Sequence, residues 1–247
     1  MDPSQSPEND PASPPKQPET VADASSRHIA RRWPLISGAT AVLLAFLLGA
    51  LILLRGSGRP IEADAEWMEE ILEHRSPVWE VPALVMNFLG GGIAAVFVIP
   101  VLILVLLLVL RRPWAALYYL VATLVSSGLV QLLKTLFGRA RPEDMIVTSD
   151  FGSFPSGHVA NAATMAVALG IIFPRLWVWI AGAVYTVAMM VSRTYLGAHW
   201  LTDTIGGLLL GVGVAVLIWA PLAAKLDGEN TIARRRRSQR RDTAATG

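Results

Sequence analysis

Residues 35–54 read LISGATAVLLAFLLGALILL, an uninterrupted stretch without a charged side chain. A helix of about 20 apolar residues has the length needed to cross the hydrocarbon core of a bilayer. The stretch is also longer than the roughly 7–15 apolar residues in the core of a secretory signal. We therefore predict that residues 35–54 form a membrane-spanning helix.

The composition of the whole chain supports a membrane location. Of its 247 residues, 53% are hydrophobic and only 16% are charged, whereas roughly 25% of residues are charged in soluble domains. The chain contains no cysteine, which excludes disulfides, thiolate metal sites and cysteine nucleophiles. A single membrane domain is the simplest organisation.

Five more apolar segments follow the first one, and three consecutive glycines interrupt the earliest of them. Their residues are 81–110, 113–133, 159–173, 176–191 and 204–222. We predict an all-α, polytopic membrane protein with six transmembrane helices in a domain that covers 31–225. A Pro- and Ser-rich disordered cytoplasmic tail is expected at 1–30, and a basic cytoplasmic tail at 226–247.

The distribution of Lys and Arg indicates the orientation of these spans. With both termini in the cytoplasm, 14 of the 21 basic residues fall on the cytoplasmic side, as the positive-inside tendency requires. The arginines at 234–237 follow the last span, so we expect them to contact anionic lipid and not nucleic acid. This orientation places the segments 55–80, 134–158 and 192–203 on the extracytoplasmic side of the cell membrane.

The first outer segment, 55–80, has a helical pattern. Apolar side chains recur on one face, at Trp67, Met68, Ile71 and Leu72, between acidic residues. This pattern predicts either an amphipathic helix on the outer membrane surface or a solvated connecting helix.

The other two outer segments collect polar residues that a membrane protein has little structural reason to gather. They contain the cations Lys134, Arg141 and Arg193, and guanidinium groups match the geometry of phosphate oxygens. Ser156 and Gly157 precede an apolar helix, whose first backbone amides can bind an anion. This combination predicts a phosphate site.

Two histidines and an aspartate in the same segments can carry the chemistry. His199 and Asp203 are neighbours at i, i+4 spacing, so Asp203 can orient His199 and leave its other ring nitrogen free to attack. His158 can protonate a leaving group and later activate water. Four other loop charges have no assigned role and are expected to be solvated: Arg139, Glu143, Asp144 and Asp150. Gly207 and Gly211 indicate close helix packing.

The three motifs together resemble the signature of the type 2 phosphatidic acid phosphatase (PAP2) superfamily, whose bacterial members include integral membrane lipid phosphatases. The motifs are Lys134 with Arg141-Pro142, Pro155-Ser156-Gly157-His158, and Ser192-Arg193 followed by His199 and Asp203. The resemblance implies a PAP2/haloperoxidase-like helical bundle that needs no metal or other cofactor.

The resemblance also implies a role for each matching residue. His199 would be the nucleophile that forms a phosphohistidine, Asp203 its partner and His158 the general acid. The substrate phosphate would be bound by Lys134, Arg141, Ser156, Gly157 and Arg193. The expected partners are a lipid phosphate substrate and membrane lipids.

These residues favour a metal-independent phosphatase of lipid phosphates or lipid diphosphates that acts at the outer membrane face. The expected substrate classes are phosphatidic acid, phosphatidylglycerophosphate and undecaprenyl diphosphate. A lipid phosphotransferase would use the same residues. A non-catalytic lipid- or anion-binding protein would not need His158, His199 and Asp203 together, and six apolar spans argue against a soluble vanadate-dependent haloperoxidase.

Overall fold

The regular elements of this protein are all helical in the part of the chain that the computed structural model describes, residues 21–56, 60–149 and 151–245. The predicted all-α class is therefore confirmed. The elements are α1 (Val21–Leu54), α2 (Glu62–Glu73), α3 (Pro77–Gly90), the π-helical η1 (Ala94–Val98), α4 (Ile99–Val109), α5 (Pro113–Phe137), α6 (Gly157–Ile172), α7 (Leu176–Tyr195) and α8 (Leu201–Ala245). The chain divides into two units, 1–33 and 34–247, and the packing described below lies within the second.

Each of the six predicted apolar segments is helical. Among the described residues, α1, α5, α7 and α8 are long and apolar enough to cross a membrane singly, and α3 with the helix at Ala94–Val109 can form a fifth, broken span. Helix α6 is apolar but has only 16 residues. The count of six crossings therefore stays a prediction.

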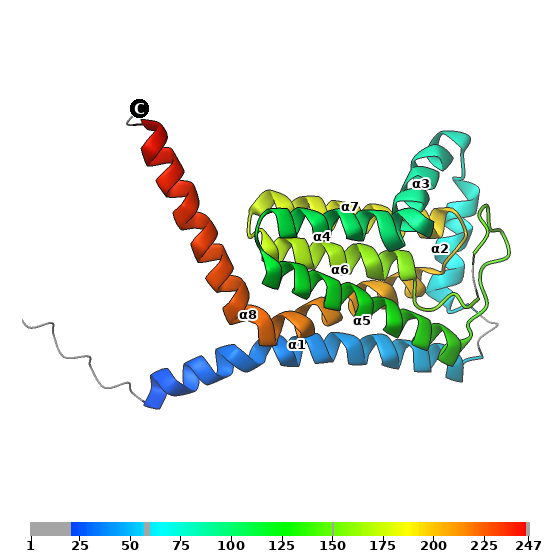
Figure 1. Cartoon of the computed structure of the whole chain (residues 1–247). Coiled ribbons are helices and arrows are strands. Elements are labelled where there is room, and N and C mark those ends of the chain that lie inside the picture. The colour runs from blue at the N-terminus through cyan, green and yellow to red at the C-terminus, as the bar shows by residue number, and fades with distance from the viewer. Residues whose placement is uncertain (1–20, 57–59, 150, 246–247) are drawn as a thin grey trace, which may run out of the picture. The chain divides into compact units, whose positions relative to one another are not determined.

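The glycines at 90–92 break the second apolar segment. The helices on the two sides of the break are bent by 46°. Gly92 has a φ of +58°, a left-handed conformation that glycine adopts without strain. The segment predicted as one interrupted span is therefore two helices that change direction at the glycines (Figure 1).

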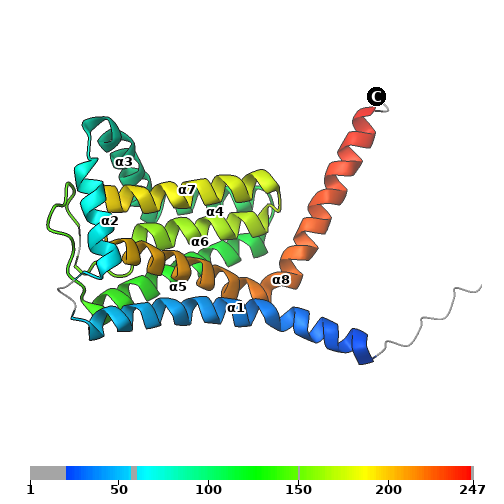
Figure 2. The ribbon, with the colours of Figure 1, turned by 180° about the vertical axis from the view of Figure 1, so that it is seen from behind.

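Helix α6 packs against α5, α7 and α8, and small residues allow the closest of these approaches. A Cβ atom on Gly207 would lie 2.5 Å from the carbonyl oxygen of Ser156, and one on Gly211 would lie 2.4 Å from that of Ala160. The predicted packing role of both glycines is confirmed. Figure 2 shows α6 and α8 running alongside each other.

Large apolar side chains remain on the outside of the helices. Phe88 on α3, Phe97 on η1 and Trp177 on α7 are each exposed by more than half of their surface. Exposed apolar surface on this scale is unfavourable in water, whereas lipid chains can cover it.

Both terminal helices extend beyond the predicted spans. Helix α1 already begins at Val21, so residues 21–30 of the predicted disordered tail are helical, while residues 1–20 of that tail lie outside the described residues. Helix α8 continues without interruption past residue 225 to Ala245, so the end of the predicted domain does not coincide with a helix end.

The predicted outer helix is present as α2, and it packs against α7 and α8. Its buried residues are Met68, as the apolar face predicted, and Asp64. Leu72 is exposed. Helix α2 lies across the end of the bundle where α7 ends and α8 begins (Figures 1 and 2).

Candidate active site

Four helix ends bring the predicted site residues together. Lys134 lies in the last turn of α5, His158 in the first turn of α6 and Arg193 in the last turn of α7, while His199 lies in the loop before α8. These four residues and Gly157 line one cavity of about 630 Å³. Residues separated by up to 65 positions in the sequence therefore share one site.

Backbone carbonyls orient two of the cations. The Lys134 Nζ donates to the carbonyl oxygen of Gly152 at 3.0 Å. Arg141 donates to the same oxygen at 2.9 Å and to the carbonyl of Ala198 at 2.5 Å. These acceptors are neutral, so they orient the two side chains without cancelling their positive charges.

Arg193 is held from another direction. Its guanidinium is buried and donates to the side-chain oxygen of Asn87 on α3. Asn87 also lines the cavity. The first half of the broken span therefore contributes a residue to the site that the sequence motifs did not indicate.

The two ring nitrogens of His199 have different neighbours. Nε2 lies 3.4 Å from a guanidinium nitrogen of Arg141, on the side of the phosphate-binding residues. Nδ1 lies 3.5 Å from Oδ2 of Asp203, which is long for a hydrogen bond. The predicted His199 and Asp203 pair is thus adjacent, and it leaves Nε2 as the nitrogen next to the cations.

The surroundings of His199 disfavour its protonated form. Burial is the largest cause that lowers the pKa of the imidazole well below 6.5, and the positive charges of Arg193, Arg141 and Lys134 lower it further. The backbone of Ser153 acts in the opposite direction. At neutral pH the ring is therefore neutral, with a proton on one nitrogen and a lone pair on the other.

Asp203 is fully buried and contacts a residue for which the sequence suggested no role. Its Oδ2 accepts a hydrogen bond from the backbone N–H of Trp200 at 2.9 Å, and its Oδ1 lies 2.6 Å from the guanidinium of Arg139. The expectation that Arg139 is a solvated loop charge was wrong, because two acidic side chains pair with it in the protein interior.

The second of these acids is Asp64, which comes from α2. Its Oδ2 lies 2.6 Å from Arg139, and its Oδ1 accepts the backbone N–H of Thr202 at 2.8 Å. The sequence predicted that α2 lies on a surface. Asp64 is one of seven acidic residues in 55–80, and nothing in the sequence distinguishes it as the buried one.

The glycine break makes room for His158. A Cβ atom on Gly91 would lie 2.2 Å from the Nε2 of His158, and one on Gly90 would lie 3.1 Å from its Cδ2. Both glycines line the cavity. The glycines that interrupt the second apolar segment therefore allow the bend and also leave space for the His158 side chain.

Ser156 and Gly157 differ in their access to the cavity. Gly157 lines it, whereas Ser156 is fully buried. The backbone N–H of Ser156 donates to the carbonyl oxygen of Asp203 at 3.0 Å, and among the described residues its hydroxyl has no hydrogen-bond partner. The structure thus places Ser156 beside the predicted site without placing its hydroxyl on the cavity wall.

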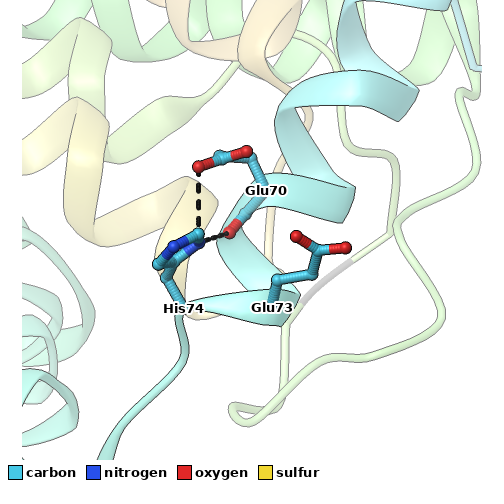
Figure 3. Close-up of side chains that lie close together, drawn as sticks. All are labelled: Glu70, Glu73 and His74. Carbon is cyan, nitrogen blue, oxygen red and sulfur yellow. Dashed lines mark hydrogen bonds and ion pairs between the residues drawn. The ribbon is translucent and has the colours of Figure 1, made fainter.

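One group of potential metal ligands occurs in the described part of the chain, and it lies on the surface. Glu70, Glu73 and His74 are all exposed on α2 and the residue that follows it, and His74 pairs with Glu70 (Figure 3). None of these residues lines the cavity.

Part of the chain is similar to a known protein family and to named proteins. Residues 115–225 match the model of the PAP2 superfamily. The chain is similar to an undecaprenyl-diphosphatase of Sulfolobus acidocaldarius, with 43% identity over 65 residues, 26% of this chain and 31% of the relative. It is also similar to a lipid A 1-phosphatase of Rhizobium johnstonii, with 37% identity over 112 residues, 40% of this chain and 45% of the relative. The matched segments thus span less than half the length of these two relatives.

The fold is shared with a solved membrane protein. The crystal structure of a transmembrane PAP2 type phosphatidylglycerolphosphate phosphatase from Bacillus subtilis matches with a TM-score of 0.64 and 26% identity, covering 74% of this chain and 94% of that one. The family match includes every predicted site residue from Lys134 to Asp203. With the apolar helices and the shared fold, these matches show a multi-pass membrane protein whose residues 115–225 belong to the PAP2 superfamily.

Proposed function

We propose that this protein removes the terminal phosphate from a lipid phosphate or lipid diphosphate, through a phosphohistidine on His199. The observation that carries the proposal is the position of the neutral His199. Its Nε2 lies 3.4 Å from Arg141, and its side chain lines a cavity together with Lys134 and Arg193. An imidazole lone pair beside three cations is suited to attack a phosphorus atom whose oxygens those cations bind.

In the first half of the reaction, the Nε2 of His199 forms a bond to phosphorus while the bond from phosphorus to the lipid oxygen breaks. Positive charge develops on the imidazole, and the Asp203 carboxylate beside Nδ1 stabilises it. His158 donates a proton to the leaving oxygen. The cations balance the charge of the phosphoryl oxygens, so most of the catalysis is positioning and electrostatics.

In the second half, His158 takes a proton from a water molecule that attacks the phosphohistidine. The bond from nitrogen to phosphorus breaks, and inorganic phosphate and neutral His199 result. His158 thus returns to its protonated form, as a residue that serves as acid and then as base must.

The substrate class rests on the position of the site and on the named relatives. The cavity is lined by residues at the ends of apolar helices, among them Lys134, His158 and Arg193, and the phosphate of a membrane lipid would lie at such helix ends. The relatives are named for lipid A and undecaprenyl diphosphate, and the structural neighbour for phosphatidylglycerolphosphate. We therefore expect one of the lipid substrates phosphatidic acid, phosphatidylglycerophosphate or undecaprenyl diphosphate.

The direct test is release of inorganic phosphate from these three lipids by the purified protein in detergent with a chelator present. His199→Ala should lower turnover by about 10⁴-fold or more, as loss of a nucleophile does. His74→Ala is the matched control, because His74 is exposed and pairs only with Glu70 among the described residues, and its turnover should stay at the wild-type value.

Three results would contradict the proposal. Normal turnover by His199→Ala would disprove the assignment of the nucleophile. Loss of wild-type activity on chelation would disprove the metal-independent mechanism. Transfer of the phosphoryl group to an added acceptor, without release of phosphate, would identify a phosphotransferase.

A further inference from the structure

Arg139 is one of the most buried large side chains in the described part of the chain, with 1% of the side chain exposed. Burial of a guanidinium is costly unless its charge and its N–H groups are matched. Both terminal nitrogens of Arg139 already donate to protein oxygens, so its guanidinium is committed to the protein interior and not to the substrate phosphate. Its burial therefore needs another explanation.

The guanidinium of Arg139 joins two carboxylates from distant parts of the chain. One terminal nitrogen donates to the Oδ1 of Asp203 at 2.6 Å and to the hydroxyl of Thr202 at 2.8 Å. The other terminal nitrogen donates to the Oδ2 of Asp64 at 2.6 Å. The flat face lies over the ring of Trp200, 5.6 Å from its centroid. A planar fork of donors suits this double contact, which a lysine ammonium cannot reproduce.

These contacts fix the rotation of the Asp203 carboxylate. Arg139 holds Oδ1, and the backbone N–H of Trp200 holds Oδ2. Since both oxygens are restrained, the oxygen next to the Nδ1 of His199 is always Oδ2. Arg139, two positions before Arg141 in the sequence, therefore restrains the carboxylate that faces His199.

Asp64 restrains the other side of Arg139 and connects it to the start of α8. Its two oxygens accept the backbone N–H of Thr202 at 2.8 Å and the Thr202 hydroxyl at 2.7 Å. The first amides of a helix have no partner within the helix, and Asp64 supplies one from α2. Asp64 lies outside the matched segment 115–225.

The charges of the cluster complement the reaction. With both carboxylates ionised, Asp64, Asp203 and Arg139 have a formal net charge of −1, and Asp203 is the member of this group next to His199. That charge is matched when the imidazole becomes positive during attack. Without Arg139, two buried carboxylates would repel each other, and the Oδ1 of Asp203 would lose its charged partner, so the carboxylate would be held less firmly against His199.

We propose that Arg139 is a positioning residue that holds Asp203 against His199, and that Asp64 of α2 holds Arg139 in place. This inference rests on the proposed function, since it assumes that His199 is the nucleophile. It assigns to α2 a role in the reaction that neither of its sequence-based interpretations included.

The test measures kcat and KM for Arg139→Gln, Arg139→Lys and Asp64→Asn with the best lipid substrate of the wild-type protein. We expect kcat to fall by about 10- to 100-fold in Arg139→Gln, the size of effect seen when an orienting partner is removed, with KM nearly unchanged. Arg139→Lys should recover part of the loss because it restores one charge, and Asp64→Asn should lose less than Arg139→Gln. The matched control is Arg75→Gln, since Arg75 contacts only backbone carbonyls among the described residues.

A double-mutant cycle separates positioning from a general loss of structure. If Arg139 acts through Asp203, then Arg139→Gln should cost less than about threefold in kcat when Asp203 is already Asn. Equal losses in both backgrounds would overturn the inference, as would a rise in KM at unchanged kcat. Arg139→Lys and Asp64→Asn keep the test decisive if Arg139→Gln does not fold.

The proposed function can fail separately from this inference. Normal turnover by His199→Ala would overturn both. Inactive His199→Ala together with fully active Arg139→Gln would leave the phosphatase proposal intact and overturn the role of Arg139.

Discussion

His199 illustrates how the site controls a single titratable group. Burial, and then the charges of Arg193, Arg141 and Lys134, lower the pKa of its imidazole well below 6.5. The group therefore stays unprotonated as pH falls through 6.5, and it gains a proton only at lower pH. The proposed nucleophile of the free protein is accordingly in its neutral form throughout the neutral range.

This environment predicts a directional effect of removing a cation. In Arg193→Gln one cause of the lowered pKa is lost, so the pKa of His199 should rise toward 6.5. The acidic limb of the profile of kcat/KM against pH should therefore move to higher pH, while the maximum value of kcat/KM falls because a phosphate-binding group is missing. The profile is measured from pH 4 to 8 with one lipid substrate, whose own ionisation is common to both proteins.

Arg75→Gln serves as the control for this experiment, because Arg75 is not among the charges that act on His199. Its profile should coincide with that of the wild type. A shift of the Arg193→Gln limb to lower pH would contradict the electrostatic account.

At the same scale, the residues that could be predicted from the sequence are those that occur in motifs with a recognisable spacing. Lys134, His158, Arg193 and His199 line one cavity as expected. Arg139 was missed, because an arginine in a polar loop has the same sequence signature whether it is solvated or buried. Its burial depends on Asp64, 75 positions earlier, and no local pattern encodes such a pairing.

At the scale of elements, the break between α3 and η1 carries the most specific consequence for function. The backbone at Gly91 is extended, with φ −137° and ψ 177°, so any residue could adopt it. A methyl group there would nevertheless lie 2.2 Å from the Nε2 of His158. The requirement for glycine at this position is therefore steric and involves the imidazole itself.

We accordingly expect Gly91→Ala to displace His158 and to lower kcat by about 10- to 100-fold, within the range that a general acid contributes. Gly128→Ala is a matched control, because a Cβ atom at Gly128 meets no atom within 4 Å, and its kcat should be unchanged. The loss should also disappear when Gly91→Ala is introduced into His158→Gln. A full further loss in that background would show that Gly91 acts on something other than His158.

The positions of the helices could be predicted from the sequence, but what each helix contributes to the site could be predicted only in part. Apolar runs located the helices because about 20 apolar residues have few alternatives in a bilayer. The triple glycine in 81–110 indicated an interruption, but its use as space for His158 depends on how α3 packs against α6. The same holds for α2: its apolar periodicity predicted a helix, but the burial of Asp64 could not be predicted from the sequence.

For the whole molecule, the exposure of the basic residues at the two ends of the helical bundle indicates which end faces the cytoplasm. Helices α5 and α7 end, and α6 and α8 begin, at the end of the bundle that holds the site (Figure 1). Of the basic residues there, Lys134, Arg139 and Arg193 are buried and are committed to internal contacts. At the opposite end of the bundle Arg112 is buried, whereas Arg111, Arg175 and Lys225 are exposed, and exposed basic residues tend to stay in the cytoplasm.

We therefore expect the site to face away from the cytoplasm, and the absence of cysteine from the chain makes this directly testable. Glu66→Cys places a thiol on exposed α2 beside the site, and Asp227→Cys places one on the exposed surface of α8. We expect these positions on opposite sides of a bilayer, because the 21 residues from Leu201 to Pro221 already rise roughly 30 Å, the thickness of the hydrocarbon core. A membrane-impermeant maleimide should label Glu66→Cys in intact spheroplasts of the expression host and Asp227→Cys only after permeabilisation. The reverse pattern would place the cavity on the cytoplasmic side, and labelling of both in intact spheroplasts would contradict the crossing of α8.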